Sequence, residues 1–235
     1  SLNKIHFVGI GGSGMSGIAE VLFNLGYTVT GSDKKESDIT NRLTDMGIEI
    51  AYDHSASNLK DVEMVVVSTA ISEGNPEIKE AKKRSIPVLA RAEMLSSLMN
   101  TKRGIAIAGT HGKTSTTSIV ASIMTEAGLD PTFINGGIIN SFNSNAQLGK
   151  GKYLIAEADE SDQSFLLLQP SMSIITNIEP DHLVNYENSF ENLKIAFLDF
   201  VKKLPFNGMA IVCGDDPIVR ELTPEFSRPY ITYGF

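Results

Sequence analysis

The chain has 235 residues, which is enough for one large or two ordinary domains. Acidic residues outnumber basic ones, 28 against 20, and this balance argues against a broad surface for nucleic acid or an anionic membrane. No apolar run reaches membrane-spanning length, and the single cysteine excludes an intramolecular disulfide framework. We therefore expect a cytoplasmic protein that does not insert into membranes, binds no nucleic acid and holds anionic ligands locally; the composition does not indicate an oligomeric state.

The first glycine-rich segment, Gly9-Ile10-Gly11-Gly12-Ser13-Gly14, follows a predicted strand and satisfies the pattern G-x-G-x-x-G. Apolar residues then recur at helical spacing up to Gly26, and a second predicted strand leads to Asp33. In such folds the loop and the helix N-terminus hold a pyrophosphate, and an acid about 20 residues further on binds a ribose. The candidate contacts are Gly11, Gly12, Ser13, Gly14, Met15 and Asp33.

Strand and helix signals keep alternating up to about residue 100. Strands are predicted at residues 48–52, 64–67 and 88–89, and helices at 76–84 and 91–99, which indicates a doubly wound parallel α/β sheet. Ser68 and Thr69 follow a strand, where ligands of such sheets bind. His54 follows another strand, and both a solvated histidine and a functional one fit that position.

A second phosphate-binding loop indicates a second domain, so we place one domain at residues 1–100 and another at 101–235. The loop runs from Gly109 to Ser115 through Thr110, His111, Gly112, Lys113 and Thr114. It follows a predicted strand and opens a helix that ends at Gly128, with Ile119 and Ile123 on its apolar face.

This second loop has the composition of a P-loop. Its lysine, Lys113, can reach the β- and γ-phosphates, and the Thr114 hydroxyl can bind Mg²⁺. The strict P-loop pattern has a glycine where this chain has Ile107, so a simple strand-to-helix turn with a surface lysine is the alternative.

Two later strand ends carry polar candidates. Glu157 is the last residue of the strand predicted at residues 153–157, where a carboxylate commonly completes the Mg²⁺ site of a P-loop protein, although the acids of residues 157–162 also fit a solvated charged run. The strand at 171–176 leads to Asn177 and His182. Imidazole suits Mg²⁺ less well than oxygen does, so a packed or surface histidine is as consistent with the chemistry as a ligand.

The remaining pattern completes the second domain. A short strand is predicted at residues 132–135, followed by a long loop at 136–151 that either faces a substrate or is mobile. An amphipathic helix begins near Phe190, and strands are predicted at 210–212 and 230–235.

Four motifs in this order resemble those of the Mur ligases: the glycine loops at residues 9–17 and 109–114, the acidic run at 157–162, and Asn177-Ile178-Glu179-Pro180-Asp181-His182. The resemblance covers the whole chain. It implies an N-terminal Rossmann-like domain for a UDP-sugar and a central P-loop ATPase domain, here incomplete. The family's third domain, which helps to bind the amino acid, has no counterpart in the sequence.

The resemblance also implies the roles of individual residues. Lys113, Glu157 and His182 would be catalytic; Thr114, Glu157 and His182 would bind metal; and residues 109–115 with Asn177 would bind ATP. Arg91 resembles the family's arginine near the UDP-sugar, where residues 11–15, Asp33, Ser68 and Thr69 are also placed. One position departs from the family pattern, because Val184 stands where an aspartate is usual.

The implied reaction is ATP- and Mg²⁺-dependent amide formation in peptidoglycan precursor synthesis. The lactyl carboxylate of UDP-N-acetylmuramate would form an acyl phosphate, which the amine of L-alanine attacks. We expect this fragment to be inactive alone. Two alternatives stay open at this stage: a recycling ligase that adds a tripeptide to the same UDP-sugar, and a nicotinamide-dependent oxidoreductase, which would leave the second loop unexplained.

Overall fold

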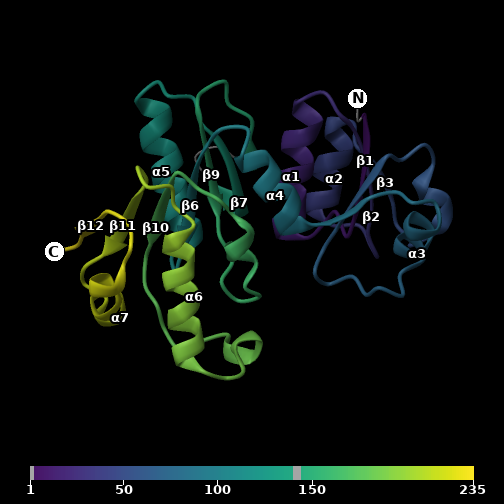
Figure 1. The fold of residues 1–235 in the computed structure, drawn as a ribbon. Coiled ribbons are helices and arrows are strands. Elements are labelled where there is room, and N and C mark those ends of the chain that lie inside the picture. Colours follow the sequence, from purple (N-terminus) through teal and green to yellow (C-terminus); the bar gives the residue numbers. More distant parts are fainter. Residues whose placement is uncertain (1–2, 140–143) are drawn as a thin grey trace. The chain divides into compact units, whose positions relative to one another are not determined.

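The computed structural model describes residues 3–139 and 144–235, which form two compact units (Figure 1). The first unit consists of residues 1–94 and 136–148, and the second of 95–135 and 149–235. The division falls within the helix α4 (Arg91–Met99), a few residues before the boundary that the sequence predicts near residue 100. Its C-terminal end belongs to the second unit, since Met99 packs so closely on Gly104 that a Cβ there would lie 2.2 Å from Met99 Cγ.

The first unit contains a parallel sheet of five strands in the order β3-β2-β1-β4-β5, as the alternating pattern predicts. Its strands are β1 (Lys4–Val8), β2 (Thr28–Ser32), β3 (Glu49–Ala51), β4 (Met64–Val67) and β5 (Val88–Ala90), and its helices are α1 (Ser13–Asn24), α2 (Asp38–Met46), α3 (Pro76–Lys83) and the short 3-10 helix η1 (Ala56–Leu59).

Helix α2 has no counterpart among the predicted elements. The Ser37 side chain accepts from the Thr40 backbone N–H while Thr40 Oγ1 accepts from the Ser37 N–H, and this capping box starts the helix. Gly47, with φ of +109°, ends it. Leu43 is its only buried apolar residue, so the apolar periodicity is too weak to reveal the helix.

The second unit contains a larger parallel sheet in which β12, β11, β10, β6, β9 and β7 follow one another. Its strands are β6 (Arg103–Ala108), β7 (Thr132–Ile139, whose last four residues belong to the first unit), β9 (Tyr153–Glu157), β10 (Met172–Ile175), β11 (Met209–Cys213) and β12 (Tyr230–Tyr233). Its helices are α5 (Lys113–Glu126), α6 (Phe190–Lys202), α7 (Pro217–Leu222) and the 3-10 helices η2 (Ser164–Leu167), η3 (Leu183–Tyr186) and η4 (Thr223–Glu225).

Two sequence-based expectations need correction. The long loop predicted at residues 136–151 instead contains the end of β7 and the strand β8 (Ser144–Gln147), which packs on α1 in the first unit. The expected apolar face of α5 is not buried, because Ile119 and Ile123 are 59% and 63% exposed. The face of α5 that packs on the sheet is centred on Thr117 and Ala121, small residues that allow a close approach.

Three phenylalanine side chains pack together in the core of the second unit. Phe165 stacks on Phe200 and meets Phe197 edge to face, with ring centroids 4.8 Å and 5.3 Å apart, and all three side chains are buried.

The ends of three strands lie at one edge of this sheet. Because β6 pairs in parallel with both β9 and β10, the segments after Ala108, Glu157 and Ile175 leave the same edge of the sheet.

Candidate functional site

The loop between β6 and α5 depends on two glycines with positive φ. Gly109 has φ of +140° and Gly112, the N-cap of α5, has φ of +86°. A Cβ on Gly109 would lie 1.9 Å from Thr176 Oγ1, so the loop can take this path only without a side chain there. The helix then begins at Lys113, and its first N–H groups face the end of the loop.

The segment after β10 holds this loop in place. The Asn177 side chain accepts from the His111 backbone N–H at 2.8 Å and donates to the His111 carbonyl at 3.0 Å. Thr176 Oγ1 donates to the same carbonyl at 2.6 Å, and Thr110 N–H donates to the Asn177 carbonyl at 3.0 Å. Asn177, expected as an ATP contact, therefore acts on the backbone of the loop.

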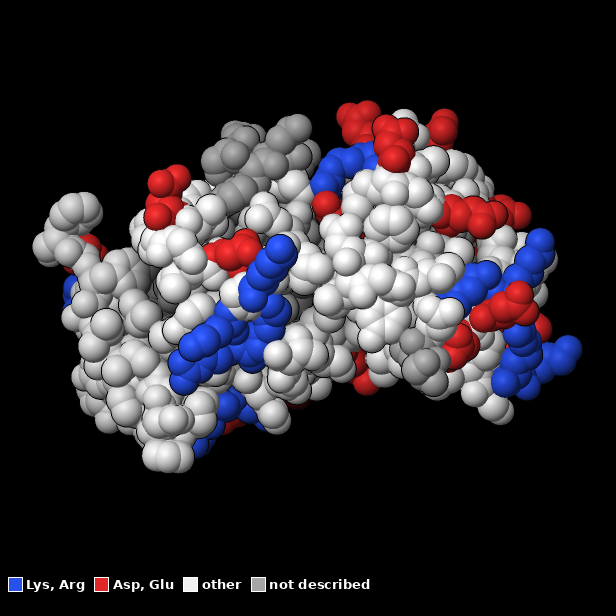
Figure 2. Space-filling model, turned by 90° about the horizontal axis from the view of Figure 1, so that it is seen from above, with Lys and Arg blue, Asp and Glu red and all other residues white. Residues whose placement is uncertain are grey.

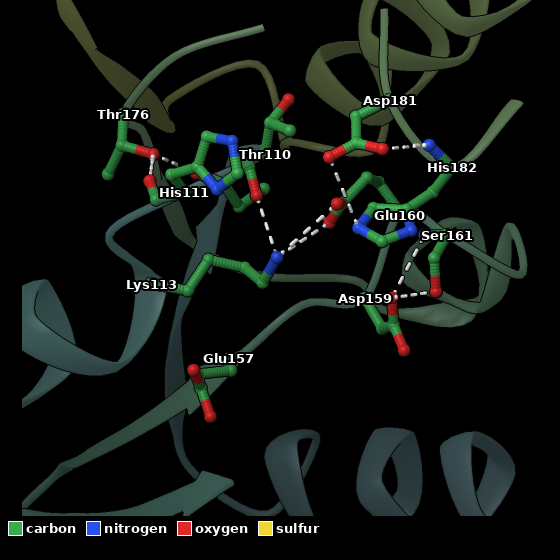
Figure 3. A network of polar contacts seen from close by, with 12 residues as sticks. Thr110, His111, Lys113, Glu157, Asp159, Glu160, Ser161, Thr176, Asp181 and His182 are labelled. Atoms are coloured by element: carbon green, nitrogen blue, oxygen red, sulfur yellow. Dashed lines mark hydrogen bonds and ion pairs between the residues drawn. The ribbon is translucent and has the colours of Figure 1, made fainter. Parts of the chain in front are cut away.

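The Lys113 ammonium lies between the loop and the segment after β9 (Figure 3). It donates to the Gly109 carbonyl at 2.7 Å and forms an ion pair with Glu160, at 3.0 Å from Oε2 and 3.3 Å from Oε1. Burial raises the pKa of Glu160, and the charge of Lys113 opposes that rise. The chain thus presents an ammonium that is already oriented by two oxygen partners.

Thr114 and Glu157, two of the expected metal ligands, meet directly. Thr114 Oγ1 donates to Glu157 Oε1 at 2.7 Å, which joins the first turn of α5 to the end of β9. A hydroxyl and a carboxylate are hard oxygen donors of the kind that Mg²⁺ prefers, so these residues fit that ion. Among residues 3–139 and 144–235, no group of three or more His, Cys, Asp or Glu side chains is arranged to hold a metal.

His182, the third expected ligand, has its described contacts elsewhere. It has φ of +54°, its backbone N–H donates to Asp181 Oδ1 at 2.9 Å, and its ring Nε2 lies 3.6 Å from Asp181 Oδ2. The ring is more than half exposed. No contact between His182 and Glu157 or Thr114 is found among the described residues, and a metal role for His182 stays a prediction.

The glycine loop of the first unit is held in place by hydrogen bonds to the end of β2 and to Asp33. Gly9 and Ile10 donate to the Ser32 carbonyl at 2.9 Å and 3.0 Å, and Gly11 N–H donates to Asp33 Oδ2 at 2.7 Å. Asp33, expected as a ribose contact, therefore also fixes the loop. A Cβ on Gly14 would lie 3.0 Å from Arg91 Cδ, so Arg91 reaches the start of α1, and its contact with a UDP-sugar stays a prediction.

The other residues of this unit that are expected to contact the UDP-sugar differ in solvent exposure. Gly12 is the N-cap of α1 and Ser13 its first residue, but the Met15 side chain is buried and its N–H donates to the Gly12 carbonyl. Ser68 lies beside Gly9, since a Cβ added to Gly9 would be 3.1 Å from Ser68 Cβ. Thr69, the next residue, is exposed.

The first unit also holds a buried polar cluster that the motifs do not predict. Glu77 Oε1 accepts from His6 Nε2 at 3.0 Å, and Oε2 accepts from His54 Nδ1 and from Ser32 Oγ, both at 2.8 Å. Asn58 adds a donor at 2.9 Å. Burial by itself would raise the pKa of Glu77, but these hydrogen bonds outweigh it and lower the pKa to about 2. His54 is therefore neither solvated nor isolated.

Sequence reasoning missed Glu160 and Thr176 as parts of the site. Glu160 was visible only as one acid in a run, and Thr176 as the last residue of a strand. Their partners lie 47 and 65 residues away in the chain, and no local spacing links them.

Two family descriptions cover almost all of the chain. Residues 4–103 match the Mur ligase family, catalytic domain, and residues 107–235 match the Mur ligase middle domain. The chain belongs to the Mur ligase family. Both glycine-rich loops described above fall within these matches.

The similar proteins are Mur ligases as well. The UDP-N-acetylmuramate–L-alanine ligase of Pelobacter propionicus is 58% identical over 99% of this chain and 51% of its own length. The UDP-N-acetylmuramate–alanine ligase structure of Thermotoga maritima is 34% identical, with a TM-score of 0.86 over 99% of this chain and 53% of its own. The Neisseria ligase for UDP-N-acetylmuramate and L-alanyl-γ-D-glutamyl-meso-diaminopimelate is 25% identical, with a TM-score of 0.90 over 100% of this chain and 79% of its own.

The chain spans about half the length of the curated relative that it matches. On the face seen in Figure 2, Lys and Arg side chains form one contiguous group at the left, and at the right basic side chains lie next to acidic ones. None of the helices in residues 3–139 and 144–235 is both long and apolar enough to cross a membrane.

Proposed function

We propose that this chain carries the UDP-sugar-binding and ATP-binding parts of an ATP-dependent ligase that joins L-alanine to the lactyl carboxylate of UDP-N-acetylmuramate. The observation that carries the proposal is that Thr114, which follows Lys113 at the start of α5, contacts Glu157 at the end of β9. The 58% identity to a ligase with that substrate and amino acid supports the choice of L-alanine. The tripeptide-adding relative is less similar, at 25% identity.

In the proposed reaction an oxygen of the lactyl carboxylate attacks the γ-phosphorus of ATP, and ADP leaves. The amine of L-alanine then attacks the acyl carbon, phosphate leaves, and the nitrogen loses a proton. Both reactants of the first step are anions, so the chain must mainly neutralise charge and align the groups. Lys113 supplies the positive charge, and the N–H groups at the start of α5 supply donors for the phosphates.

Thr114 and Glu157 would hold the Mg²⁺ that accompanies ATP. Bound there, the ion would neutralise charge on the phosphate oxygens. The separation of 2.7 Å between the two oxygens supports binding of one ion by both, because neighbouring oxygen ligands of an octahedral Mg²⁺ lie at a similar separation. His182 is proposed for a second metal on the motif alone.

In the first unit, the loop at residues 9–14 would bind the diphosphate of the UDP-sugar. The N-terminus of α1 and the Arg91 side chain beside Gly14 supply a partial and a full positive charge at the same place. A nicotinamide cofactor could use the same loop, but such an enzyme would have no use for Lys113, Thr114 and Glu157.

Calorimetric titrations of the chain test the proposal. We expect binding of UDP-N-acetylmuramate without NAD, and binding of ATP that strengthens with Mg²⁺. Lys113→Ala should weaken ATP binding about tenfold or more and leave UDP-N-acetylmuramate binding unchanged. NAD binding in place of the UDP-sugar would refute the assignment of the first loop, and unchanged ATP affinity in Lys113→Ala would refute that of the second.

A further inference from the structure

Glu160 is the one partner of the P-loop lysine that the proposed function does not use. It lies in the segment after β9, three residues beyond Glu157, and its side chain is only 3% exposed. Lys113, by contrast, is 20% exposed. The carboxylate therefore forms the buried side of the pair and the ammonium the accessible side.

The ammonium of Lys113 carries three N–H groups that can donate hydrogen bonds. One donates to the Gly109 carbonyl at 2.7 Å, and the two oxygens of Glu160, at 3.0 Å and 3.3 Å, can share a second. For the third N–H no other acceptor is found among residues 3–139 and 144–235, and its direction is set by the other two.

Separating this pair would be costly. A buried carboxylate that loses its cation has no solvent to replace it, and breaking such pairs is strongly destabilising. The charge of Lys113 is what opposes the effect of burial on Glu160. A phosphate that binds at the loop is therefore expected to share the ammonium with Glu160 and not to remove it.

The backbone around Glu160 is itself fixed. Its carbonyl accepts from the Tyr186 hydroxyl and from the Gln163 N–H. The preceding Asp159 accepts from both the N–H and the hydroxyl of Ser161. The carboxylate thus stands on a loop held at several points, as a group that orients another must.

We propose that Glu160 is a positioning residue for the phosphate-binding lysine: together with the Gly109 carbonyl it fixes the ammonium of Lys113 so that one N–H is directed at the nucleotide phosphates. This inference rests on the proposed binding of ATP at the second loop. It assigns to an acidic side chain a favourable effect on the binding of an anion, although its charge alone would repel that anion.

The test is a double-mutant cycle on ATP affinity, measured by calorimetry at fixed Mg²⁺. Glu160→Ala should weaken ATP binding about tenfold, since the lysine loses an oriented charge-assisted hydrogen bond. Glu160→Gln keeps an acceptor oxygen at the same reach and should bind ATP at least as tightly as the parent chain. In a Lys113→Ala background, Glu160→Ala should have no further effect.

Two further variants complete the design. Glu160→Met has the same length without an acceptor and replaces Glu160→Ala if that variant does not fold, as judged by thermal unfolding. Asp162→Asn removes an acid from the same loop without touching Lys113 and should keep the affinity of the parent.

The outcomes separate the two proposals. If the parent chain binds no ATP, the proposed function fails and the inference fails with it. If the parent binds ATP but Glu160→Ala or Glu160→Met binds it equally or more tightly, only the positioning role is overturned. An equal loss in the Lys113→Ala background would also overturn it, because Glu160 would then act without the lysine.

Discussion

At the scale of single residues, the buried carboxylate of Glu77 has the most consequence for stability. It is fully buried in the first unit and accepts from His6, His54, Ser32 and Asn58. Glutamine at this position leaves one acceptor oxygen in place of two and puts an NH2 group against buried donors. We expect Glu77→Gln to lower the free energy of unfolding by about 3 kcal/mol, measured by urea unfolding at neutral pH. Glu73→Gln, at a side chain that is 91% exposed, is the matched control and should change little.

The pKa of Glu77 also predicts a pH dependence. Because its pKa is about 2 in the folded chain and 4.5 for the ordinary carboxyl, the unfolded state binds a proton that the folded state does not. This contribution to stability is fully present above pH 4.5 and is lost as the pH falls from about 4.5 towards 2. The parent chain should therefore lose more stability than Glu77→Gln over this range. Parallel curves for the two chains would contradict the prediction.

Glu157 is the residue at which the proposed Mg²⁺ site can be tested alone. Glu157→Gln keeps an oxygen that can accept from Thr114 Oγ1 but removes the negative charge. We expect the gain in ATP affinity on adding Mg²⁺ to fall about tenfold or more, while ATP affinity in the presence of a chelator stays within twofold of the parent. Titrations with and without Mg²⁺ measure both quantities. An undiminished Mg²⁺ effect would place the ion elsewhere.

At the scale of elements, the close contact between the loop that precedes α5 and the segment after β10 depends on Gly109. A side chain there would meet Thr176 Oγ1 at 1.9 Å, at a backbone φ that favours glycine. We expect Gly109→Ala to destabilise the chain by about 2 kcal/mol and to abolish measurable ATP binding.

Matched variants separate the clash from the general effect of adding a methyl group. Gly74→Ala, where the nearest atom would be 3.8 Å away, should leave stability and ATP affinity close to those of the parent. Thr176→Ala removes the atom that clashes and should restore part of the stability of Gly109→Ala. If Gly109→Ala alone folds and binds ATP like the parent, the loop does not need its observed path.

At the scale of the whole molecule, two compact units each carry a parallel sheet and a glycine-rich loop, and we propose that each loop binds its own ligand. We expect the first unit to bind UDP-N-acetylmuramate and the second to bind ATP independently of each other. Arg91→Ala should weaken UDP-N-acetylmuramate binding about tenfold with ATP affinity unchanged, and Lys113→Ala should do the reverse. In the double variant, calorimetry should find each ligand weakened as in the corresponding single variant, within about 0.5 kcal/mol. A loss of UDP-sugar binding in Lys113→Ala would show that one ligand uses both loops.

The sequence by itself determined the sheets, both glycine loops and the family, because these features are local. Alternating apolar strands and helices and a glycine run at a strand end each appear within some 30 residues, and the expected helices at α1, α3, α4, α5 and α6 are present. The polar helix α2 and the strand β8 escaped this reasoning, since their residues lack a clear apolar period.

Only the tertiary structure decided which side chains meet. Glu160 rather than Glu157 pairs with Lys113, Thr176 and Asn177 hold the P-loop, and Glu77 gathers its donors from separate segments. Each of these contacts joins residues that are distant in the chain, through parallel strands whose carboxyl ends share one edge or through the packing of a helix on a sheet. The order and register of strands set such contacts, and a single sequence contains no local signal for either.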